Sequence, residues 1–430
     1  MLAAGVALGF ALSGAPPTIV LGTLAALVAI GAAVYSPALG LAVLAFSYPF
    51  DLTTFAGPLK LTTSEALLLI LAVVLLARHL ARNPPPFFRT PLDIPVVLFA
   101  LATVMSLLGL TGFYGDQLVA LVKAAGGFLL FFIATQSLQE RRDVWLVIVA
   151  VLAAGMVLAA ETVIPVVQGG SVSVLDRATG NVIDPNLFAG YLVLLVPLAL
   201  GAGIAMRWRW GPLLSGLAML LLGAALVATL SRGGWLGFVA GIATMVIMLP
   251  GRRRVVLGVA GGVLAVMLIG LAGPVAARLG TGAGASPFQT FIDRIPIWQA
   301  AWTMFSGHPI FGIGVNNFGN FIGGINPSLD VNQAHDLFLN IATERGLLGF
   351  LTFLFVLGSV FVMLFRTRRL IANRRDAVLL AAITGSIVAF LADSLFDVAY
   401  YDYKILLLFW LVMGIAASLP RVLKKPIALI

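Results

Sequence analysis

Long apolar runs follow one another along almost the whole chain, and they limit the possible folds severely. Only 10% of the 430 residues are charged, whereas soluble domains carry about a quarter charged residues. A helix needs roughly 20 apolar residues to cross a bilayer. The sequence therefore predicts an all-α integral membrane protein with 12–14 transmembrane helices. The apolar runs lie at about residues 2–12, 18–34, 37–50, 65–80, 92–110, 119–136, 144–165, 187–206, 211–230, 233–250, 254–273, 347–365, 377–395 and 404–419.

Basic residues are concentrated in alternate connections between these runs. Because cytoplasmic connections of membrane proteins are enriched in lysine and arginine, the pattern predicts that both termini are cytoplasmic. The same residues account for the net charge of +9 without a nucleic-acid partner. Of the 26 lysines and arginines, 18 fall at positions 78–89, 141–142, 207–209, 252–254, 366–375 and 421–425.

One connection, residues 274–346, is much longer than the others and falls on the outward side. Connections of this length are usually functional or disordered, and its richness in aromatic residues favours a structured loop. The chain thus divides into membrane helices in 1–273, an extracytoplasmic catalytic loop in 274–346, and three membrane helices in 347–430. A helix lying on the membrane surface is predicted within the loop, starting near Pro296. Its aromatic and aliphatic stripe comprises Phe288, Phe291, Ile295, Trp298, Trp302 and Phe305.

Three arginines fall in outward connections, where the charge bias of membrane proteins works against them. Arg232 lies in a very short connection, "TLSRGGWLG", Arg177 in "DRATGNVIDPN" and Arg294 in "FIDRIPIW". Each alone is compatible with a side chain that reaches the lipid headgroups. Their combination beside the long loop favours a shared anionic ligand, because the planar guanidinium group binds phosphate oxygens in a bidentate manner.

The stretch "NQAHDLFLNIATERGLLG", residues 332–349, joins a polar cluster to an apolar run. Its pattern predicts a helix that ends at Gly346, with His335 on the same face as Phe338. Asp336 would lie on a neighbouring polar stripe. A structural, hydrogen-bonded histidine is one interpretation of His335. Its position at the water edge of an outward loop favours a proton-handling role.

Lys123 lies within a predicted span, about two turns from Asp116. Charge inside a membrane is commonly functional, although a lysine so close to a helix end can also extend to the interface.

Several classes of chemistry are disfavoured by the composition. The chain has no cysteine and only three scattered histidines, so disulfides, thiol nucleophiles and a metal site are not predicted. The glycines of "GHPIFGIGVNNFGNF" lack the strand–turn–helix context of a dinucleotide site. No Asp-x-Asp pair occurs in the early outward loops, which weighs against a diphosphate bridged by metal. We predict no cofactor.

Four motifs occur in an order that resembles the O-antigen ligase and O-antigen polymerase superfamily. They are "RATGNVIDPNLFAGYL", "TLSRGGWLGFVAG", "RIPIWQAAWTMFSGHPIFGIGVNNF" and "HDLFLNIATERGLLGFL", within about residues 175–365. The resemblance implies a GT-C-like membrane glycosyltransferase that acts with inversion and without metal. The donor would be a glycan on undecaprenyl diphosphate at the outer face of the bacterial inner membrane. The acceptor would be a lipopolysaccharide core sugar on lipid A (ligase) or a second lipid-linked glycan (polymerase), and both remain open.

The resemblance also implies roles for individual residues. His335 would act on the acceptor hydroxyl as the catalytic residue. The donor diphosphate would be held by Arg232 and Arg294, and by Arg177 as a further family arginine. Negative charge develops on the diphosphate as it leaves, and fixed cations can stabilise it. The candidate supporting residues are Lys123, Asn186, Trp298 and Asp336.

Two other functions are compatible with a polytopic membrane protein. A transporter or flippase of polyprenyl lipids or polysaccharides should show repeat symmetry and broken helices near the membrane midplane. Instead, this chain concentrates its polar residues in one outward loop. A peptidoglycan-type polymerase of the shape-and-division class shares the general architecture, but its motif set is absent from the sequence.

Overall fold

The computed structural model describes most of the chain outside the N-terminal segment and several connections. The described residues are 28, 30–50, 62–81, 86–109, 115–167, 184–205, 210–249, 251, 254–258, 260–262, 289–371 and 373–424.

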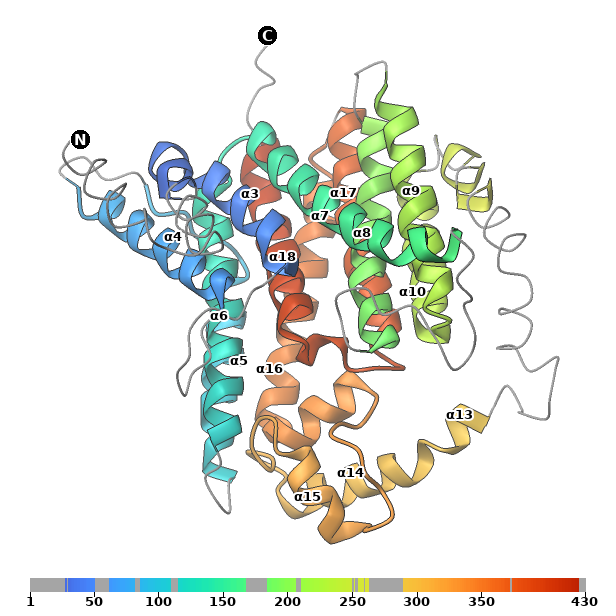
Figure 1. Cartoon of the computed structure of the whole chain (residues 1–430). Helices are drawn as coiled ribbons and strands as arrows, with labels where there is room; N and C mark the ends of the chain where they lie inside the picture. Colours follow the sequence, from blue (N-terminus) through green and yellow to red (C-terminus); the bar gives the residue numbers. More distant parts are fainter. Residues whose placement is uncertain are drawn as a thin grey trace, which may run out of the picture.

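Every regular element named in these ranges is a helix (Figure 1), which confirms the all-α membrane fold. The membrane part begins with α3 (Pro37–Ser47), η1 (Tyr48–Phe50), α4 (Thr63–His79), α5 (Asp93–Met105), η2 (Ser106–Gly109) and α6 (Gly115–Ser137). It continues with α7 (Arg141–Val167), α8 (Pro185–Ala205), α9 (Gly211–Ala228) and α10 (Arg232–Met248). The long connection 274–346 contains α13 (Gln289–Ile292), α14 (Ile295–Gly307) and α15 (Phe318–Ile325). The chain then forms α16 (Leu337–Arg368), α17 (Arg374–Asp393), η4 (Ala399–Tyr401) and α18 (Tyr403–Lys424).

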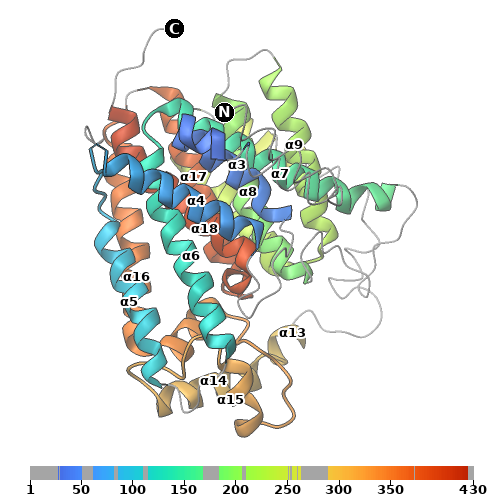
Figure 2. The same ribbon diagram turned by 60° about the vertical axis from the view of Figure 1, so that its left-hand side comes forward.

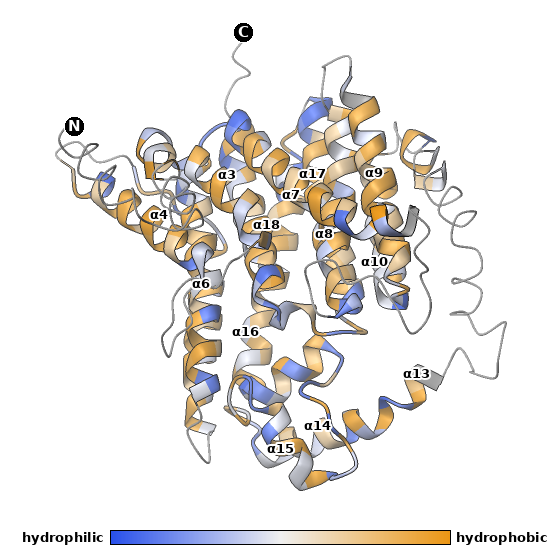
Figure 3. Ribbon diagram, in the orientation of Figure 1, coloured by the Kyte–Doolittle hydropathy of each residue, from blue (hydrophilic) through white to orange (hydrophobic). Residues whose placement is uncertain are grey.

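Six helices in the described part are long and apolar enough to cross a membrane: α6, α7, α8, α16, α17 and α18. Four shorter apolar helices accompany them, at Pro37–Phe50, Asp93–Gly109, Leu213–Ala228 and Arg232–Met248. Figure 3 shows these helices as mainly hydrophobic along their lengths. The predicted runs at 2–12, most of 18–34 and most of 254–273 lie outside the described residues, so the count of 12–14 helices stays a prediction.

The centre of the bundle is formed by α8, α17 and α18. Most of the apolar window of each is buried within the protein, 89% in α18 and 83% in α8, whereas only 39% is buried in α16. α17 packs against both α8 and α10, and α18 packs against α6. Helices α5 and α6 therefore lie on one side of this centre and α9 and α10 on the other, as Figure 1 shows.

Polar contacts tie the helices together at the end of the bundle that carries most of the basic residues. Arg141, the first residue of α7, forms a bidentate ion pair with Asp376 of α17, with Nη2–Oδ2 at 2.8 Å. Arg421 of α18 donates to the carbonyls of Thr135 (2.7 Å) and Leu138 (2.6 Å) at the end of α6. Figure 2 shows α14 and α15 at the opposite end. The contacts of Arg141 and Arg421 and the helices α14 and α15 thus lie at opposite ends of the bundle, which agrees with the predicted alternation of connections. Which of the two ends faces the cytoplasm stays a prediction.

The segment that contains α14 and α15 has a small hydrophobic core of its own. Ile297, Ala301 and Met304 form the buried stripe of α14, and they pack with residues such as Phe318 of α15. As predicted, the helix begins at Ile295 with Pro296 in its first turn. Trp302 is 62% exposed, so the aromatic stripe and the core stripe occupy different faces of α14.

Helix α16 changes direction at Gly346, the end of the predicted loop. Gly346 has φ 63° and ψ −168°, and a Cβ atom there would lie 2.3 Å from the carbonyl oxygen of Ile310. Gly312 has φ 73°, and its Cβ would lie 2.5 Å from the Glu344 carbonyl oxygen. The backbone N–H groups of Ile313 and Gly314 donate to Thr343 and Glu344 at 3.0 Å. The glycines of "GHPIFGIGVNN" thus allow this loop to lie directly against the kink.

Candidate active site

His335 lies just before α16 and not within it. The predicted helical face shared with Phe338 is therefore wrong: His335 has φ 51°, in the left-handed region, and the helix begins at Leu337. The reason is that Asp336 is the N-cap residue, with Oδ1 accepting from the Leu339 N–H at 2.8 Å. An N-cap residue has non-helical dihedral angles, so the chain before it cannot continue the helix.

The backbone around His335 is held on both sides. Ala334 donates its N–H to Oδ1 of Asn340 at 2.8 Å and accepts from Nε1 of Trp298 at 3.0 Å. On the other side, the Leu337 N–H donates to the carbonyl of Ser394 at 2.9 Å. Trp298 thus contacts the backbone next to His335, and its supporting role stays a prediction.

Asp397 is the acidic partner of His335. Nδ1 of His335 lies 3.6 Å from Oδ1 of Asp397, with the histidine side chain 28% exposed and the aspartate side chain 5% exposed. Oδ1 of Asp397 also accepts from the N–H of Val398 at 2.7 Å, which fixes the carboxylate. The imidazole therefore has one nitrogen facing a carboxylate inside the protein while the ring remains accessible.

Arg294 lies in the same group of residues, at the N-cap position of α14. Burial lowers the pKa of its guanidinium group, and the negative charges of Asp397, Asp336 and Asp393 oppose this effect. Burial also raises the pKa of Asp336 above the usual carboxyl value, while its hydrogen bonds from Leu339 and Phe338 and the charge of Arg294 lower it. The structure thus brings together three of the predicted residues, namely His335, Arg294 and Asp336.

Asp393 lies next to the start of α10, which begins at Arg232. Asp393 is fully buried, and in the described part of the chain neither carboxylate oxygen has a hydrogen-bond partner. Its oxygens lie between two glycines: a Cβ atom at Gly190 of α8 or at Gly233 of α10 would be 3.0 Å from them. Gly233 follows Arg232, the first residue of α10, where Oγ of the N-cap Ser231 accepts from the Gly234 N–H at 3.3 Å.

Two further residues were predicted for the site, Asn186 and Arg177. Asn186 lies in the first turn of α8 and donates its N–H to Oδ1 of Asp184 at 2.6 Å. Arg177 lies outside the described residues. Within the described part, no three His, Asp or Glu side chains are arranged to hold a metal ion, and metal independence stays a prediction.

The family comparison matches the part of the chain that contains this group. Residues 217–354, from α9 to the first turns after the kink in α16, match the family model described as O-antigen ligase. The resemblance to the O-antigen ligase and polymerase superfamily is confirmed. The O-antigen ligase segment contains Arg232, Arg294, Trp298 and His335, whereas Asp393 and Asp397 follow it in the chain. No curated protein matches the sequence.

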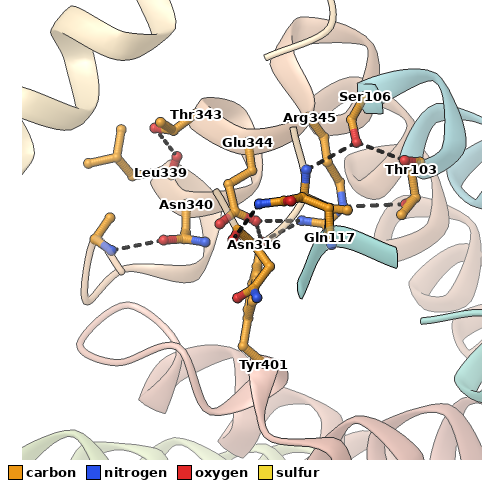
Figure 4. Close-up of polar contacts among 12 residues, drawn as sticks. Thr103, Ser106, Gln117, Asn316, Leu339, Asn340, Thr343, Glu344, Arg345 and Tyr401 are labelled. Atoms are coloured by element: carbon orange, nitrogen blue, oxygen red, sulfur yellow. Dashed lines mark hydrogen bonds and ion pairs between the residues drawn. The ribbon is translucent and has the colours of Figure 1, made fainter. Parts of the chain in front are cut away.

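A second polar group was not predicted from the sequence (Figure 4). Glu344 and Arg345 of this group belong to the matched segment 217–354, whereas Thr103 and Tyr401 come from other parts of the chain. Tyr401 donates its hydroxyl to Oε2 of Glu344 at 2.6 Å. Arg345 donates Nη1 to the Tyr401 hydroxyl and Nε to Oγ1 of Thr103 at 3.3 Å. Arg345 and Glu344 also form an ion pair at 3.6 Å. Burial raises the pKa of Tyr401, so the phenol remains a donor at neutral pH.

Lys123 belongs to this second group and not to the group around His335. Its Nζ lies 5.6 Å from the ring centroid of Tyr403. It lines a cavity together with Arg345 and Tyr401. The lysine therefore faces the interior of the protein, and the structure does not favour the interpretation that it extends to the lipid headgroups.

Proposed function

We propose that the protein is an inverting, metal-independent glycosyltransferase of the O-antigen ligase or polymerase type. It transfers a glycan from undecaprenyl diphosphate to a sugar hydroxyl at the outer face of the bacterial inner membrane, with both termini in the cytoplasm. The membrane helices and the family match support a membrane enzyme of this general kind. The observation that carries the specific proposal is the pairing of His335 with Asp397 beside Arg294.

His335 accepts the proton of the acceptor hydroxyl in this proposal. Nδ1 faces Asp397, which leaves Nε2 to face the acceptor. As the acceptor oxygen forms its bond to the anomeric carbon, the O–H proton moves to Nε2 and the bond from that carbon to the diphosphate oxygen breaks. The Asp397 carboxylate stabilises the imidazolium that results, and it orients the ring.

Arg294 and Arg232 stabilise the leaving undecaprenyl diphosphate. The charge of Arg294 acts on Asp393, and Gly233, the residue after Arg232, packs against the same carboxyl group. The negative charges of Asp397, Asp336 and Asp393 favour the charged form of Arg294 before the donor arrives. Each charge-assisted contact to the diphosphate contributes on the order of 1.5–3 kcal/mol.

The placement of the polar groups favours transfer over transport. His335, Arg294 and Asp397 lie at one end of the bundle, next to α14, and not halfway along the membrane helices. A lipid-linked donor enters such a site from the outer leaflet, and its acceptor glycan arrives from the aqueous side. Both a lipid-A-core sugar and a second lipid-linked glycan fit this description.

Purified protein tests the proposal. Undecaprenyl-diphosphate-linked glycan is incubated with either lipid A-core or a second lipid-linked glycan, with and without EDTA. We expect a new glycosidic bond with one of the two acceptors, inverted anomeric configuration by NMR, and the same rate in EDTA. Retained configuration, or a rate abolished by EDTA and restored by Mg²⁺, would contradict the mechanism.

A further inference from the structure

A cavity of about 300 Å³ lies on the α5–α6 side of the bundle, away from Arg232 and α10. Its walls come from α6, from the start of α18, from the segment 315–316 and from Arg345 of α16. Asp116 and Asn316 are exposed residues of its lining, whereas Ala124 and Leu406 are buried ones. The cavity therefore extends from the loop end of the bundle into the region between the membrane helices.

Lys123 is the cation of this cavity that lacks a carboxylate partner. No Asp or Glu oxygen of the described residues lies within 4.0 Å of its Nζ, which lies over the ring of Tyr403. The charge of Asp402 acts on Lys123 only from beyond that distance. Asp116, the carboxylate of the cavity lining, is exposed. Asp402 accepts from the N–H groups of Lys404 (2.9 Å) and Ile405 (3.2 Å).

Arg345 adds a second positive charge, but its environment is different. Glu344 offsets its charge at 3.6 Å, and two of its three guanidinium nitrogens donate to Tyr401 and Thr103. Arg345 is thereby fixed in the cavity wall, whereas the three donors of the Lys123 ammonium group are available to a ligand. A lysine placed among apolar helices, with no carboxylate oxygen of the described residues within 4.0 Å, favours an anionic ligand.

We propose that this cavity binds a negatively charged group, a carboxylate or a phosphate, on the acceptor glycan. The proposal rests on the proposed function, which supplies the acceptor. Lys123 forms the ion pair with this group, and the wall that contains Arg345 and Tyr401 shapes the cavity around it. Lys123 is thus a specificity-determining residue and has no part in bond breaking.

The position of the cavity relative to His335 suits an acceptor. Leu337, two residues after His335, and Arg345 are separated by about 12 Å along α16 at 1.5 Å per residue. A short oligosaccharide can therefore reach from the cavity to the imidazole. Arg232, one of the donor arginines, begins α10 on the opposite side of the bundle from α5 and α6. The donor held by Arg232 and an acceptor held in the cavity therefore approach His335 from different sides.

Binding measurements on the purified full chain test the charge preference without any requirement for turnover. The probes are cellobiouronic acid and maltose 1-phosphate, with cellobiose and maltose as uncharged counterparts. Wild-type protein should bind the charged sugars at least about tenfold more tightly. Lys123→Met should weaken their binding by about 10- to 100-fold, which corresponds to the loss of one charge-assisted contact. Lys123→Arg keeps the charge and should retain most of the affinity, even if Lys123→Met folds poorly.

Lys404→Met is the matched control, because Lys404 lies next to Tyr403 but does not line the cavity. We expect it to bind charged sugars as the wild type does. An equal loss in Lys404→Met, or no preference for charged sugars in wild type, would overturn the proposal.

Nanodiscs of phosphatidylglycerol and of phosphatidylcholine test a second source of anions. A site that depends on Lys123, takes phosphatidylglycerol and ignores the acidic sugars would be a lipid headgroup site, which also overturns the acceptor assignment.

Kinetics separate this inference from the proposed function. With an acidic acceptor, Lys123→Met should raise the acceptor KM by about 10- to 100-fold and leave the donor KM unchanged. Unchanged acceptor KM in an active Lys123→Met enzyme would reject the inference alone. Absence of transfer by wild-type protein, together with sugar binding that depends on Lys123, would reject the glycosyltransferase and support the charge specificity of the cavity.

Discussion

Nδ1 of His335 and Oδ1 of Asp397 lie 3.6 Å apart at the junction of two connections that are distant in sequence. The hydrogen bond from the Leu337 N–H to the Ser394 carbonyl joins the same two connections. The pair is therefore built by backbone contacts between the start of α16 and the turn after α17.

His335→Gln should lower turnover by about 10²–10⁴-fold, because glutamine forms hydrogen bonds but cannot accept the acceptor proton. Asp397→Asn should lower it by at least about tenfold, because the imidazolium loses its counter-charge. Steady-state rates at saturating donor, with thermal unfolding as a check on folding, measure both effects. Donor binding should be nearly unchanged in each variant.

The double variant distinguishes a catalytic pair from two structural residues. If His335 and Asp397 act as a unit, the double variant should be about as slow as His335→Gln alone. Additive losses, or an active His335→Gln enzyme with a flat pH profile, would mean that His335 only positions the loop. His335→Asn is a useful companion, because asparagine tolerates the positive φ of this position.

Arg232→Ala and Arg294→Ala should each lower the rate of transfer by at least about tenfold, mainly because the donor binds more weakly. Arg→Lys should restore little, because an ammonium group cannot form the bidentate contact. Arg294→Ala should also lower thermal stability, since Asp336 and Asp397 would lose a nearby positive charge. Near-normal donor KM and kcat in both alanine variants would remove the diphosphate-binding role.

The helices were largely predictable from the sequence, because each apolar run is long and ends at a recognisable signal. The runs at 119–136 and 187–206 correspond to α6 and α8, and the start of α14 at Ile295 follows from Pro296. The position of His335 was not predictable from periodicity. Asp336 was assigned to a polar stripe within the helix, but it caps that helix and excludes His335 from it.

Asp397 and Tyr401 were missed for a different reason. Both lie in a short connection between two apolar runs, where polar residues are expected on the water side without any special role. Their partners, His335 and Glu344, come from a distant part of the chain. Only the packing of α17 and α18 against α16 brings them together, and a single sequence carries no signal for that contact. "SLFDVAYYDY" offered a weak hint, two acidic residues at the outer edge of adjacent spans.

The predicted sidedness can be tested by labelling single cysteines, which is simple in a chain without native cysteine. Ser328, just after α15, and Leu370, just after α16, are both exposed and lie at opposite ends of the bundle. In intact spheroplasts, an impermeant maleimide should label Ser328→Cys and spare Leu370→Cys until the cells are opened. The reverse pattern would invert the topology and place His335 in the cytoplasm.

Gly346→Ala should destabilise the protein by at least about 2 kcal/mol, because the backbone there suits glycine and the new methyl group meets the Ile310 carbonyl. Gly323→Ala is the control: it lies in α15, nothing lies within 4 Å of its Cβ position, and its effect should stay below about 1 kcal/mol. Thermal unfolding in detergent compares the two. Similar stabilities would mean that the kink is not required for folding.

Asp336→Asn should change the dependence of stability on pH in a defined direction. Asparagine caps a helix about as well as aspartate, so the substitution mainly removes a half-buried charge. Burial raises the pKa of Asp336 above that of the unfolded chain, and this effect exceeds the opposing ones from the Leu339 and Phe338 hydrogen bonds and from Arg294. The folded protein thus binds the proton more tightly than the unfolded chain does.

This contribution of the Asp336 proton to stability is fully present below the unfolded pKa and is lost as the pH rises through the folded pKa. The melting temperature of the variant should therefore rise relative to wild type between about pH 4 and about pH 8. A relative fall over this range would show that the attraction between Arg294 and an ionised Asp336 outweighs burial.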